Sequence, residues 1–456
     1  NNFTPPTMIT AALIVFIVGY LGIIFEHQIH INKTATALLT GIIGWTVIMV
    51  MTPPDKLWST TSMVKFLSEH GLQKGAEAYQ HFITHALSHH LAEISEILFF
   101  LLGAMTIVEL IDAHDGFNLV TRAINQRRPM TLLWVFSILT FFLSALLDNL
   151  TTSIVMVSLL RKMIKNAEHR KIFACMMIIA ANAGGAWSPM GDVTTTMLWI
   201  GGQLSVTTLV SKLLVPSLVC MVVPLLFAQV MFKGIRSIQL EDPKETHSKH
   251  IEGQLWIFCS GVIGLVSVPV FKTLTHLPPY TGMLLALGMI WVISELIHKD
   301  KDVEVRKKFS AAYALQRIDT SSVLFFLGIL LAISALQTVD LLNQLSGWMQ
   351  ANIANLDLVI YIIGIASAVI DNVPLVAASM AMYDMNIYPQ DHRLWEFLAY
   401  AAGTGGSILI IGSAAGVAVM GMEKIDFVWY VKRISLLAFI GYSCGAATYL
   451  IIESLR

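Results

Sequence analysis

Long hydrophobic runs alternate with short polar segments along most of the chain. The longest runs approach or reach the roughly 20 apolar residues that a helix needs to cross a bilayer core. They include residues 8–25, 34–51, 255–271, 282–297 and 434–452. A more polar stretch separates the first two runs from the apolar sequence that resumes at Ile94. This pattern predicts an all-α polytopic membrane protein.

Composition supports the same class. The 456 residues are 55% hydrophobic and 13% charged, and the mean hydropathy is +0.69, too apolar for an ordinary soluble protein of this length. A formal net charge of −1 argues against a nucleic-acid partner. The four cysteines lack the spacing of a zinc or disulfide framework, and no phosphate-binding glycine loop is present. We therefore expect no bound cofactor.

One short motif occurs twice within apolar sequence. Ser-Ala-Leu-Leu-Asp-Asn at 144–149 returns as Ser-Ala-Val-Ile-Asp-Asn at 367–372. Asp and Asn are good turn formers, which offers a purely structural explanation. However, an unpaired carboxylate at membrane depth costs about 2.5–3.5 kcal/mol even on the lenient insertion scale. We therefore interpret both copies as parts of a functional site.

The first copy lies in an apolar block, 131–160, that can be one long helix or a hairpin that enters the membrane and returns. Short cytoplasmic loops carry an excess of Lys and Arg. Three arginines precede this block, and five basic residues follow it between positions 161 and 171. Both ends are then cytoplasmic, which predicts a re-entrant hairpin with Asp148 and Asn149 near its tip.

The next apolar run, 172–200, is interrupted by a polar, Gly- and Pro-containing stretch at 182–192. Proline removes a backbone donor and glycine weakens a helix, so a continuous helix is not expected. A helix that breaks at membrane depth exposes backbone carbonyl and amide groups, which can bind an ion.

The second half of the chain repeats this order at offsets of about 221 to 226 residues. A second hairpin is expected at 357–384, and a second broken helix at 395–421 around the stretch from Gly403 to Ser413. The predicted organisation is therefore N-terminal spans and an extramembrane segment (1–93), repeat 1 (94–231), a linker with scaffold spans (232–320) and repeat 2 (321–456).

Loop charge also predicts how the repeats are oriented. Counting crossings from the first hairpin places 22 of the 29 lysines and arginines in loops on the cytoplasmic side. Repeat 1 then begins outside and repeat 2 inside, the second hairpin enters from the outside, and both termini lie outside. Inverted repeats with broken helices and a midplane site are typical of secondary transporters.

Three motifs resemble a known family, the NhaD-type sodium/proton antiporters of the ion transporter superfamily. They are the paired Asp-Asn motifs, Asn-Ala-Gly-Gly-Ala-Trp-Ser-Pro-Met-Gly-Asp-Val-Thr-Thr-Thr from Asn182, and Gly-Thr-Gly-Gly-Ser-Ile-Leu-Ile-Ile-Gly-Ser from Gly403. The likeness runs from about residue 94 to the C-terminus. It implies export of Na⁺ or Li⁺ driven by inward proton flow across a bacterial inner membrane, by a homodimer with a mobile transport domain and a static scaffold.

Na⁺ prefers oxygen ligands, which carboxylates, amides and hydroxyls supply. At the hairpin tips we expect the Na⁺ ligands Asp148, Asn149, Asp371 and Asn372. From the broken helices we expect Asn182, Ser188, Asp192, Thr194, Thr195, Ser407 and Ser413. The hydroxyls can alternatively bond back to their own helix. Two glycine pairs, Gly184 with Gly185 and Gly405 with Gly406, are expected to leave backbone groups of the broken helices available to the ion.

Burial disfavours a charged carboxylate, so Na⁺ and H⁺ are expected to compete for the same oxygens. Such competition yields exchange, which also predicts that transport rises with pH. Ser144 and Ser367 each lie four residues before an aspartate, on the same helix face. They either orient that carboxylate from a second shell or are small residues for close helix packing.

A histidine stripe leads into the third span, on the predicted outer side. His81, His85 and His89 lie four residues apart and are followed by Glu93. Three histidines at this spacing can bind zinc or sense pH. The alternative interpretation is the solvated face of an interfacial helix.

Two other functions remain as alternatives. An anion permease for arsenite or dicarboxylates needs cationic or neutral ligands at the tips, and neither tip contains Arg or Lys. An intramembrane aspartyl hydrolase needs both carboxylates at one catalytic centre with a cleft for a peptide bond. The sequence therefore predicts a transporter, not an enzyme, that exchanges Na⁺ or Li⁺ for H⁺.

Overall fold

The structure is a computed structural model, and its regular secondary structure is helical in the described residues. It describes residues 7–117, 119, 128–164, 166–231, 252–342, 344–345, 347 and 355–455. Within these ranges no β-strand is present, and eight helices are long and apolar enough to cross a membrane. The prediction of an all-α polytopic membrane protein is confirmed.

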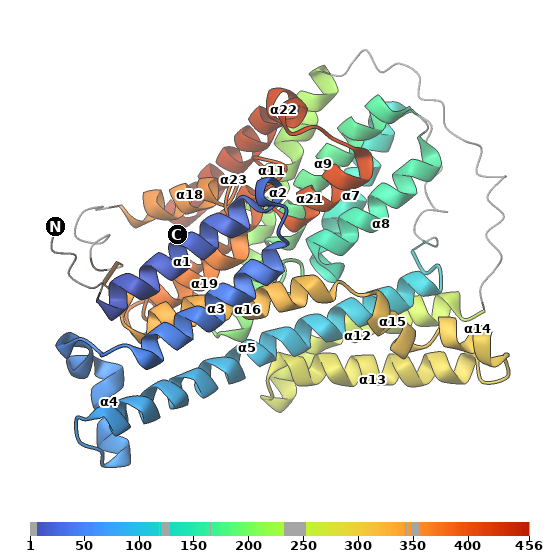
Figure 1. Ribbon diagram of the computed structural model, residues 1–456. Coiled ribbons are helices and arrows are strands. Elements are labelled where there is room, and N and C mark those ends of the chain that lie inside the picture. The colour runs from blue at the N-terminus through green and yellow to red at the C-terminus, as the bar shows by residue number, and fades with distance from the viewer. Residues whose placement is uncertain are drawn as a thin grey trace. The chain divides into compact units, whose positions relative to one another are not determined.

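The candidate spans include the longest helices of the chain (Figure 1). They are α3 (Lys33–Val50), α5 (Ala76–Ala113), α7 (Pro129–Leu147), α11 (Val206–Met231), α12 (Gln254–Thr275), α13 (Pro279–Ile297), α16 (Thr320–Thr338) and the segment Phe427–Ser454, which contains α22 (Phe427–Tyr430) and α23 (Leu436–Ser454). A short π-helix, Val431–Ser435, joins α22 to α23.

The other described helices are not among the candidate spans. They are α1 (Met8–Ile24), α2 (Glu26–Ile29), the 3₁₀-helix Asp55–Ser59, α4 (Thr61–His70), α8 (Asn149–Met163), α9 (Ala167–Gly185), α10 (Val193–Ile200), α14 (Val303–Lys308), α15 (Ala311–Arg317), α18 (Leu356–Ala366), α19 (Asn372–Met382), α20 (Arg393–Gly405) and α21 (Ala414–Glu423).

The chain packs into two compact units, each built from segments far apart in sequence. The first unit contains Asn1–Leu98, Asp319–Leu356 and Ala377–Tyr388. The second contains Phe99–Ile318, Asp357–Val376 and Pro389–Arg456. The units group residues that pack together, whereas the four segments expected from the sequence are consecutive and follow an internal repeat. The two divisions therefore answer different questions, and the repeat stays a prediction.

In the first unit, α1 lies beside α3 (Figure 1), and α3 packs closely on α16. A Cβ atom on Gly328 of α16 would lie only 2.5 Å from the backbone nitrogen of Leu38, so the two backbones are in contact there. The indole of Trp45 donates a hydrogen bond to the carbonyl of Leu331 at 2.9 Å. Close approach at glycine and a bond to a backbone carbonyl are both typical of packed membrane helices.

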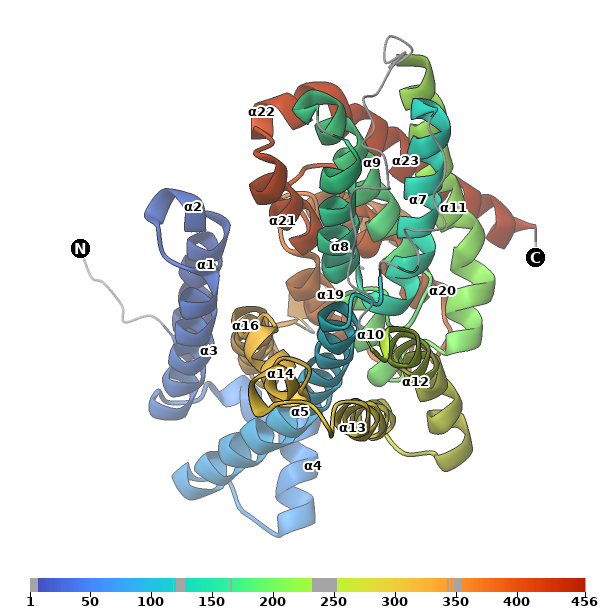
Figure 2. The same ribbon diagram turned by 90° about the vertical axis from the view of Figure 1, so that its right-hand side faces the viewer.

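In the second unit, α7, α8 and α9 lie side by side (Figure 2), and α11 packs along α23. Two glycines of α23 allow this approach, since a Cβ on Gly441 would lie 2.5 Å from the carbonyl oxygen of Cys220, and one on Gly445 would lie 2.6 Å from that of Pro216. This unit contains every residue that the sequence predicts as an ion ligand.

Candidate ion-binding site

The first Asp-Asn pair lies where two helices meet. Helix α7 ends at Leu147 and α8 begins at Asn149. Asp148, between them, has φ +81° and ψ 159°, a backbone region that is almost confined to glycine and costs about 1–3 kcal/mol for other residues. Its carboxylate accepts hydrogen bonds from the backbone nitrogen and the hydroxyl of Thr151, both at 2.8 Å. These bonds hold the carboxylate at the start of α8.

The second Asp-Asn pair lies in a similar break. Helix α18 ends at Ala366, and α19 begins at Asn372. Asp371 precedes α19, and its Oδ1 accepts a hydrogen bond from the backbone nitrogen of Val373 at 3.2 Å. Both aspartates are half-buried, whereas the asparagines that follow them are buried.

Two further helices are interrupted, as the glycine-containing stretches at 182–192 and 403–413 predict. Helix α9 continues through Asn182 to Gly185, and α10 begins at Val193. In the second half, α20 ends at Gly405 and α21 begins at Ala414. Residues 186–192 and 406–413 therefore lack regular α-helix, and Asn182 projects from a regular turn of α9 rather than from the break itself.

The helices that restart after the two breaks have polar caps. Asp192 accepts a hydrogen bond from the nitrogen of Thr194 at 3.3 Å, and Ser413 accepts one from Gly416 at 3.1 Å. Together with Asp148 and Asp371, these residues place oxygen atoms at the N-terminal ends of four helices, α8, α10, α19 and α21. Free backbone N–H groups and the positive end of the helix dipole stabilise carboxylates at such positions.

Asn182 is the centre of a buried hydrogen-bond network. Its Oδ1 accepts from Nδ2 of Asn149 at 3.1 Å. Its Nδ2 donates to the hydroxyls of Ser407 at 2.9 Å and Ser413 at 3.0 Å. All four side chains are buried. The structure thus brings together a tip residue of the first hairpin and residues from both broken helices.

A second group of predicted residues surrounds Asp192, which is also buried. Nδ2 of Asn372 donates to Oδ2 of Asp192 at 3.1 Å. Asn372 directly follows Asp371, and Asn149 of the neighbouring network directly follows Asp148. Three carboxylates therefore share one region of the second unit, between buried amides and hydroxyls.

Two of the three remaining predicted hydroxyls, those of Ser188 and Thr195, donate to backbone carbonyls. Ser188 donates to the carbonyl of Ala145, and Thr195 donates to that of Asp192 at 2.9 Å. Thr194 is buried and contributes its backbone nitrogen to Asp192. The Ser188 and Thr195 hydroxyls therefore shape the first break through bonds to the main chain, whereas the Thr194 hydroxyl is buried without a hydrogen-bond partner among the described residues.

Ser144 and Ser367 bond to neighbouring backbone. The Ser144 hydroxyl donates to Ala181 at 2.6 Å, and that of Ser367 donates to Gly364 at 2.8 Å and to Ala402 at 3.3 Å. These bonds tie each Asp-bearing segment to the adjacent broken helix, so the structure places both serines in helix packing and not on the aspartates.

The four predicted glycines lie where backbones touch. A Cβ on Gly184 would lie 2.1 Å from the carbonyl oxygen of Phe141, and one on Gly405 would lie 1.9 Å from that of Gly364. Gly185 and Gly406 approach carbonyls within their own breaks, at 2.3 Å and 2.8 Å from the corresponding Cβ positions. Larger residues would push the Asp-bearing segments away from the broken helices.

Sequence reasoning missed two residues of this region. Thr151 binds Asp148 through both its nitrogen and its hydroxyl, and the spacing from Asp148 to Thr151 is that of a helix cap and its N3 residue, a signal that was available. Tyr430 donates from its hydroxyl to the carbonyl of Ser407 at 2.7 Å. No local sequence pattern indicates that contact, because α22 reaches the break only through tertiary packing.

An ion cluster around a buried carboxylate, the Glu423 clamp, joins helices that meet at the site. It consists of Glu423, at the end of α21, and two arginines. Oε1 of Glu423 lies 2.6 Å from Nε of Arg161, on α8, and Oε2 lies 2.8 Å from Nε of Arg170, on α9. Because α8 and α21 both start at site residues, this clamp fixes their opposite ends.

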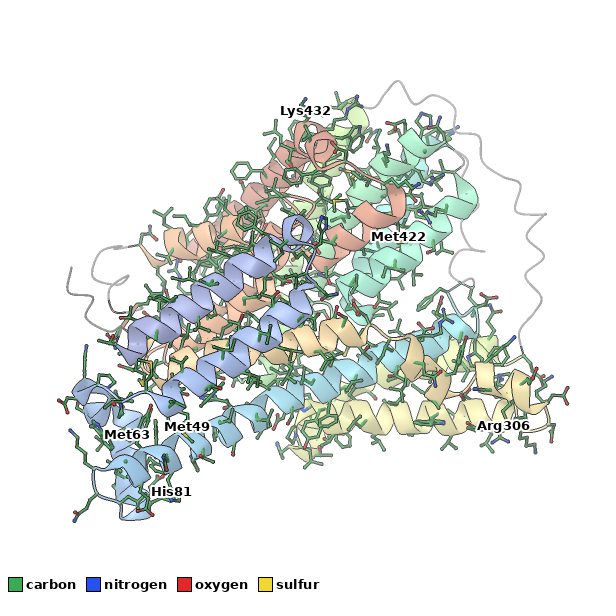
Figure 3. The ribbon with its side chains drawn as sticks, in the orientation of Figure 1. Met49, Met63, His81, Arg306, Met422 and Lys432 are labelled. Carbon is green, nitrogen blue, oxygen red and sulfur yellow. The ribbon has the colours of Figure 1, made fainter. Side chains whose placement is uncertain are left out.

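The predicted histidine stripe does not converge on one point. His81, His85 and His89 are exposed on α5, and Figure 3 shows His81 near the N-terminal end of that helix, beside α4. The ring of His85 packs on Phe66 at 5.2 Å between ring centroids. Glu93 is approached by His89 and by His90, which sequence reasoning did not single out.

The fold and this site together indicate the class of protein to which the chain belongs. Interrupted membrane helices that gather acidic and amide side chains inside a helical unit are typical of secondary transporters. The profile of the citrate transporter family matches residues 20–405 of the chain.

Individual relatives define the family more narrowly. Sodium/proton antiporter 1 of Arabidopsis thaliana is 47% identical over 449 residues, covering 98% of this chain and 73% of the relative. Sodium/proton antiporter 2 of the same plant is 44% identical over 445 residues, with 97% and 99% coverage. The Na⁺/H⁺ antiporter NhaD of Alkalimonas amylolytica is 30% identical over 474 residues, with 96% and 89% coverage. The chain belongs to the family of NhaD-type sodium/proton antiporters, and it is a transporter, not an enzyme.

Proposed function

We propose that the protein exchanges Na⁺ for H⁺ across a membrane, with the ions as substrates and no cofactor. The observation that carries this proposal is the buried oxygen cluster formed by the two Asp-Asn pairs and the two broken helices. Na⁺ is a hard cation that takes carboxylate, amide and hydroxyl oxygens. The relatives named as sodium/proton antiporters support the same exchange, and Li⁺ is an expected alternative substrate.

In the proposed mechanism, Na⁺ and H⁺ use the same oxygens at different times. Asp148, Asp371 and Asp192 supply the carboxylates that take either ion. Asn372 orients Asp192, and the Asn149–Asn182 pair holds the first tip against the broken helices. Because burial penalises the charged carboxylates, they bind either a cation or protons before the site is exposed to the other side. Exchange then requires only that the empty, charged site does not reorient.

The citrate transporter profile is compatible with an anion substrate, but the charge of the site argues against one. Segments 144–149, 182–192, 367–372 and 403–413 contain three aspartates and no Lys or Arg. A carboxylate substrate would be repelled by this arrangement, whereas a cation neutralises it. The charge of the site therefore favours a cation such as Na⁺ over a carboxylate anion.

We further propose that the two halves form inverted repeats whose hairpins enter the membrane from opposite sides, with both termini outside. The distribution of Lys and Arg among the loops supports this arrangement. A homodimer and a bacterial inner membrane stay predictions from the resemblance. The two plant relatives share more sequence with the chain than the bacterial one does, so the membrane in question can also be a plant membrane.

Cysteine labelling tests the orientation. Asn166 and Gln390 are exposed and lie outside the helices. Single cysteines at these positions, in a background without the four native cysteines, should react with a membrane-impermeant maleimide from opposite sides. Reaction from the same side would refute the inverted arrangement while leaving the exchange reaction to be tested separately.

Everted vesicles test the exchange itself. Vesicles that hold an acid interior should lose their pH gradient on addition of Na⁺ or Li⁺ and keep it on addition of choline. If citrate or another carboxylate collapses the gradient and Na⁺ does not, the anion alternative replaces this proposal. Addition of K⁺ under the same conditions measures selectivity.

A further inference from the structure

Two adjacent histidines on α5 converge on one glutamate, outside the site described above. Nδ1 of His90 lies 3.2 Å from Oε2 of Glu93, and Nδ1 of His89 lies 3.7 Å from Oε1. One ligand atom from each of the three side chains lies within 4.8 Å of the other two. Glu93 is three residues from one histidine and four from the other, so both face it along the helix.

These separations fit a metal ion. Zn²⁺ binds imidazole nitrogen at about 2.0–2.1 Å and carboxylate oxygen at about 2.0–2.2 Å, usually in tetrahedral geometry. Ligand atoms around such an ion are therefore about 3.3–3.5 Å apart, a value that the two nitrogen-to-oxygen separations bracket. One nitrogen of each imidazole lies within 4.8 Å of the other.

The position and the solvent exposure of the three side chains also suit a metal-binding site. The His90 side chain is only 16% exposed, and its ring lies 6.3 Å from that of Trp45 between centroids, so it is held in place. His89 and Glu93 are 62% and 60% exposed, which leaves a route for an ion from solvent. The cluster thus combines one fixed ligand with two accessible ones.

We propose that His89, His90 and Glu93 bind one divalent transition-metal ion, with Zn²⁺ as the reference case. Water completes the coordination, as it does in zinc sites with three protein ligands. Imidazole nitrogen suits Zn²⁺, Cu²⁺ and Ni²⁺, whereas Na⁺ prefers oxygen ligands. This site is therefore chemically distinct from the proposed Na⁺ site, and its ligands differ from the His81, His85 and His89 set that the sequence spacing suggests.

The test is Zn²⁺ binding to the full-length protein in detergent, measured by isothermal titration calorimetry in chelator-treated buffer. We expect one Zn²⁺ per chain at this site. His90→Ala and Glu93→Ala should each weaken binding about tenfold to hundredfold or more, since even outer groups around a metal contribute that much. Glu93 is exposed, so Glu93→Ala is expected to fold. His90 is largely buried beside Trp45, so the folding of His90→Ala is checked by Na⁺/H⁺ exchange in metal-free buffer, which should stay unchanged for both variants.

The matched control is the double variant His81→Ala, His85→Ala, which removes two histidines from the same helix and leaves the cluster intact. It should bind Zn²⁺ with wild-type affinity. The proposal is overturned if His90→Ala and Glu93→Ala bind Zn²⁺ like the wild type, or if the control loses binding. Neither result bears on Na⁺/H⁺ exchange, because that activity is measured without the metal.

Discussion

The two Asp-Asn tips have the same sequence motif but different contacts. At the first tip, Thr151 donates two hydrogen bonds to Asp148. At the second tip, the residue three positions after Asp371 is Pro374, which has no backbone N–H to donate. Asp371 instead accepts from Val373 at 3.2 Å. The first carboxylate is thus held as a regular helix cap, and proline prevents the same bond at the second.

The asparagines of the two tips also have different hydrogen-bond partners. Asn149 donates to the neutral amide of Asn182, whereas Asn372 donates to the carboxylate of Asp192. At an offset of 221 residues, Asn182 and Asp192 correspond to Gly403 and Ser413 in the second half. The extra amide and carboxylate therefore occur in the first broken helix and not in the second. We infer that the second tip faces the more strongly charged part of the site.

The largest expected effect comes from removing either tip carboxylate. Asp148→Asn and Asp371→Asn keep size and hydrogen bonding but remove the titrating charge, so each should abolish Na⁺/H⁺ exchange in vesicles. Protein levels should stay normal, because a buried amide costs less to desolvate than a buried carboxylate. Asp384→Asn, on an exposed segment, serves as the matched control and should transport normally. Wild-type exchange by both tip variants would show that the tips do not carry the reaction.

Substituting the tip asparagines by alanine should weaken Na⁺ binding more at the second tip than at the first. Asn372→Ala deletes a hydrogen bond to a charged group, worth about 1.5–3 kcal/mol, and should raise the Na⁺ concentration at half-saturation about tenfold or more. Asn149→Ala deletes a bond between neutral amides, worth about 0.5–1.5 kcal/mol, and should raise it about twofold to tenfold. The difference between the tips would be refuted by equal shifts, or by a larger shift for Asn149→Ala.

Backbone strain should distinguish the tips in stability. Asp148 occupies a conformation that favours glycine, whereas Asp371 is not among the residues with positive φ. Among transport-inactive variants, Asp148→Gly should therefore be more stable than Asp148→Ala by about 1–3 kcal/mol. The Gly and Ala variants at position 371 should show no such gain for glycine. Thermal unfolding in detergent measures both pairs.

The smallest expected effect concerns Thr151. Thr151→Val removes the hydroxyl that donates to the Asp148 carboxylate but leaves the backbone cap that holds this carboxylate in place. Because the cap compensates for part of a bond to a charged group, worth about 1.5–3 kcal/mol, we expect the Na⁺ concentration at half-saturation to rise only roughly twofold to tenfold. Thr151→Ser keeps the donor and should restore the wild-type half-saturation. If serine fails to restore it, the threonine acts through packing and not through its bond to Asp148.

The sequence predicted the helical class and the interruptions because glycine, proline and paired polar residues in apolar runs are local signals. Asn182 shows the limit of that reasoning. It was expected as an ion ligand in a break, but α9 stays helical past it, since the following glycines still accept helical geometry. Its bonds to Ser407 and Ser413 depend on how two broken helices pack. Likewise, spacing alone favoured His81 and His85 over His90, because it does not show which imidazoles turn towards Glu93.

Competition between Na⁺ and H⁺ for the same carboxylates is the central claim, and the pH dependence of Na⁺ half-saturation tests it most directly. In proteoliposomes at fixed ionic strength, the Na⁺ concentration at half-saturation should fall as pH rises, by up to about tenfold per pH unit for each competing proton, until it reaches a constant value at alkaline pH. The maximal rate should change far less. A half-saturation that is independent of pH, with a maximal rate that carries all the pH dependence, would contradict a shared site for the two ions.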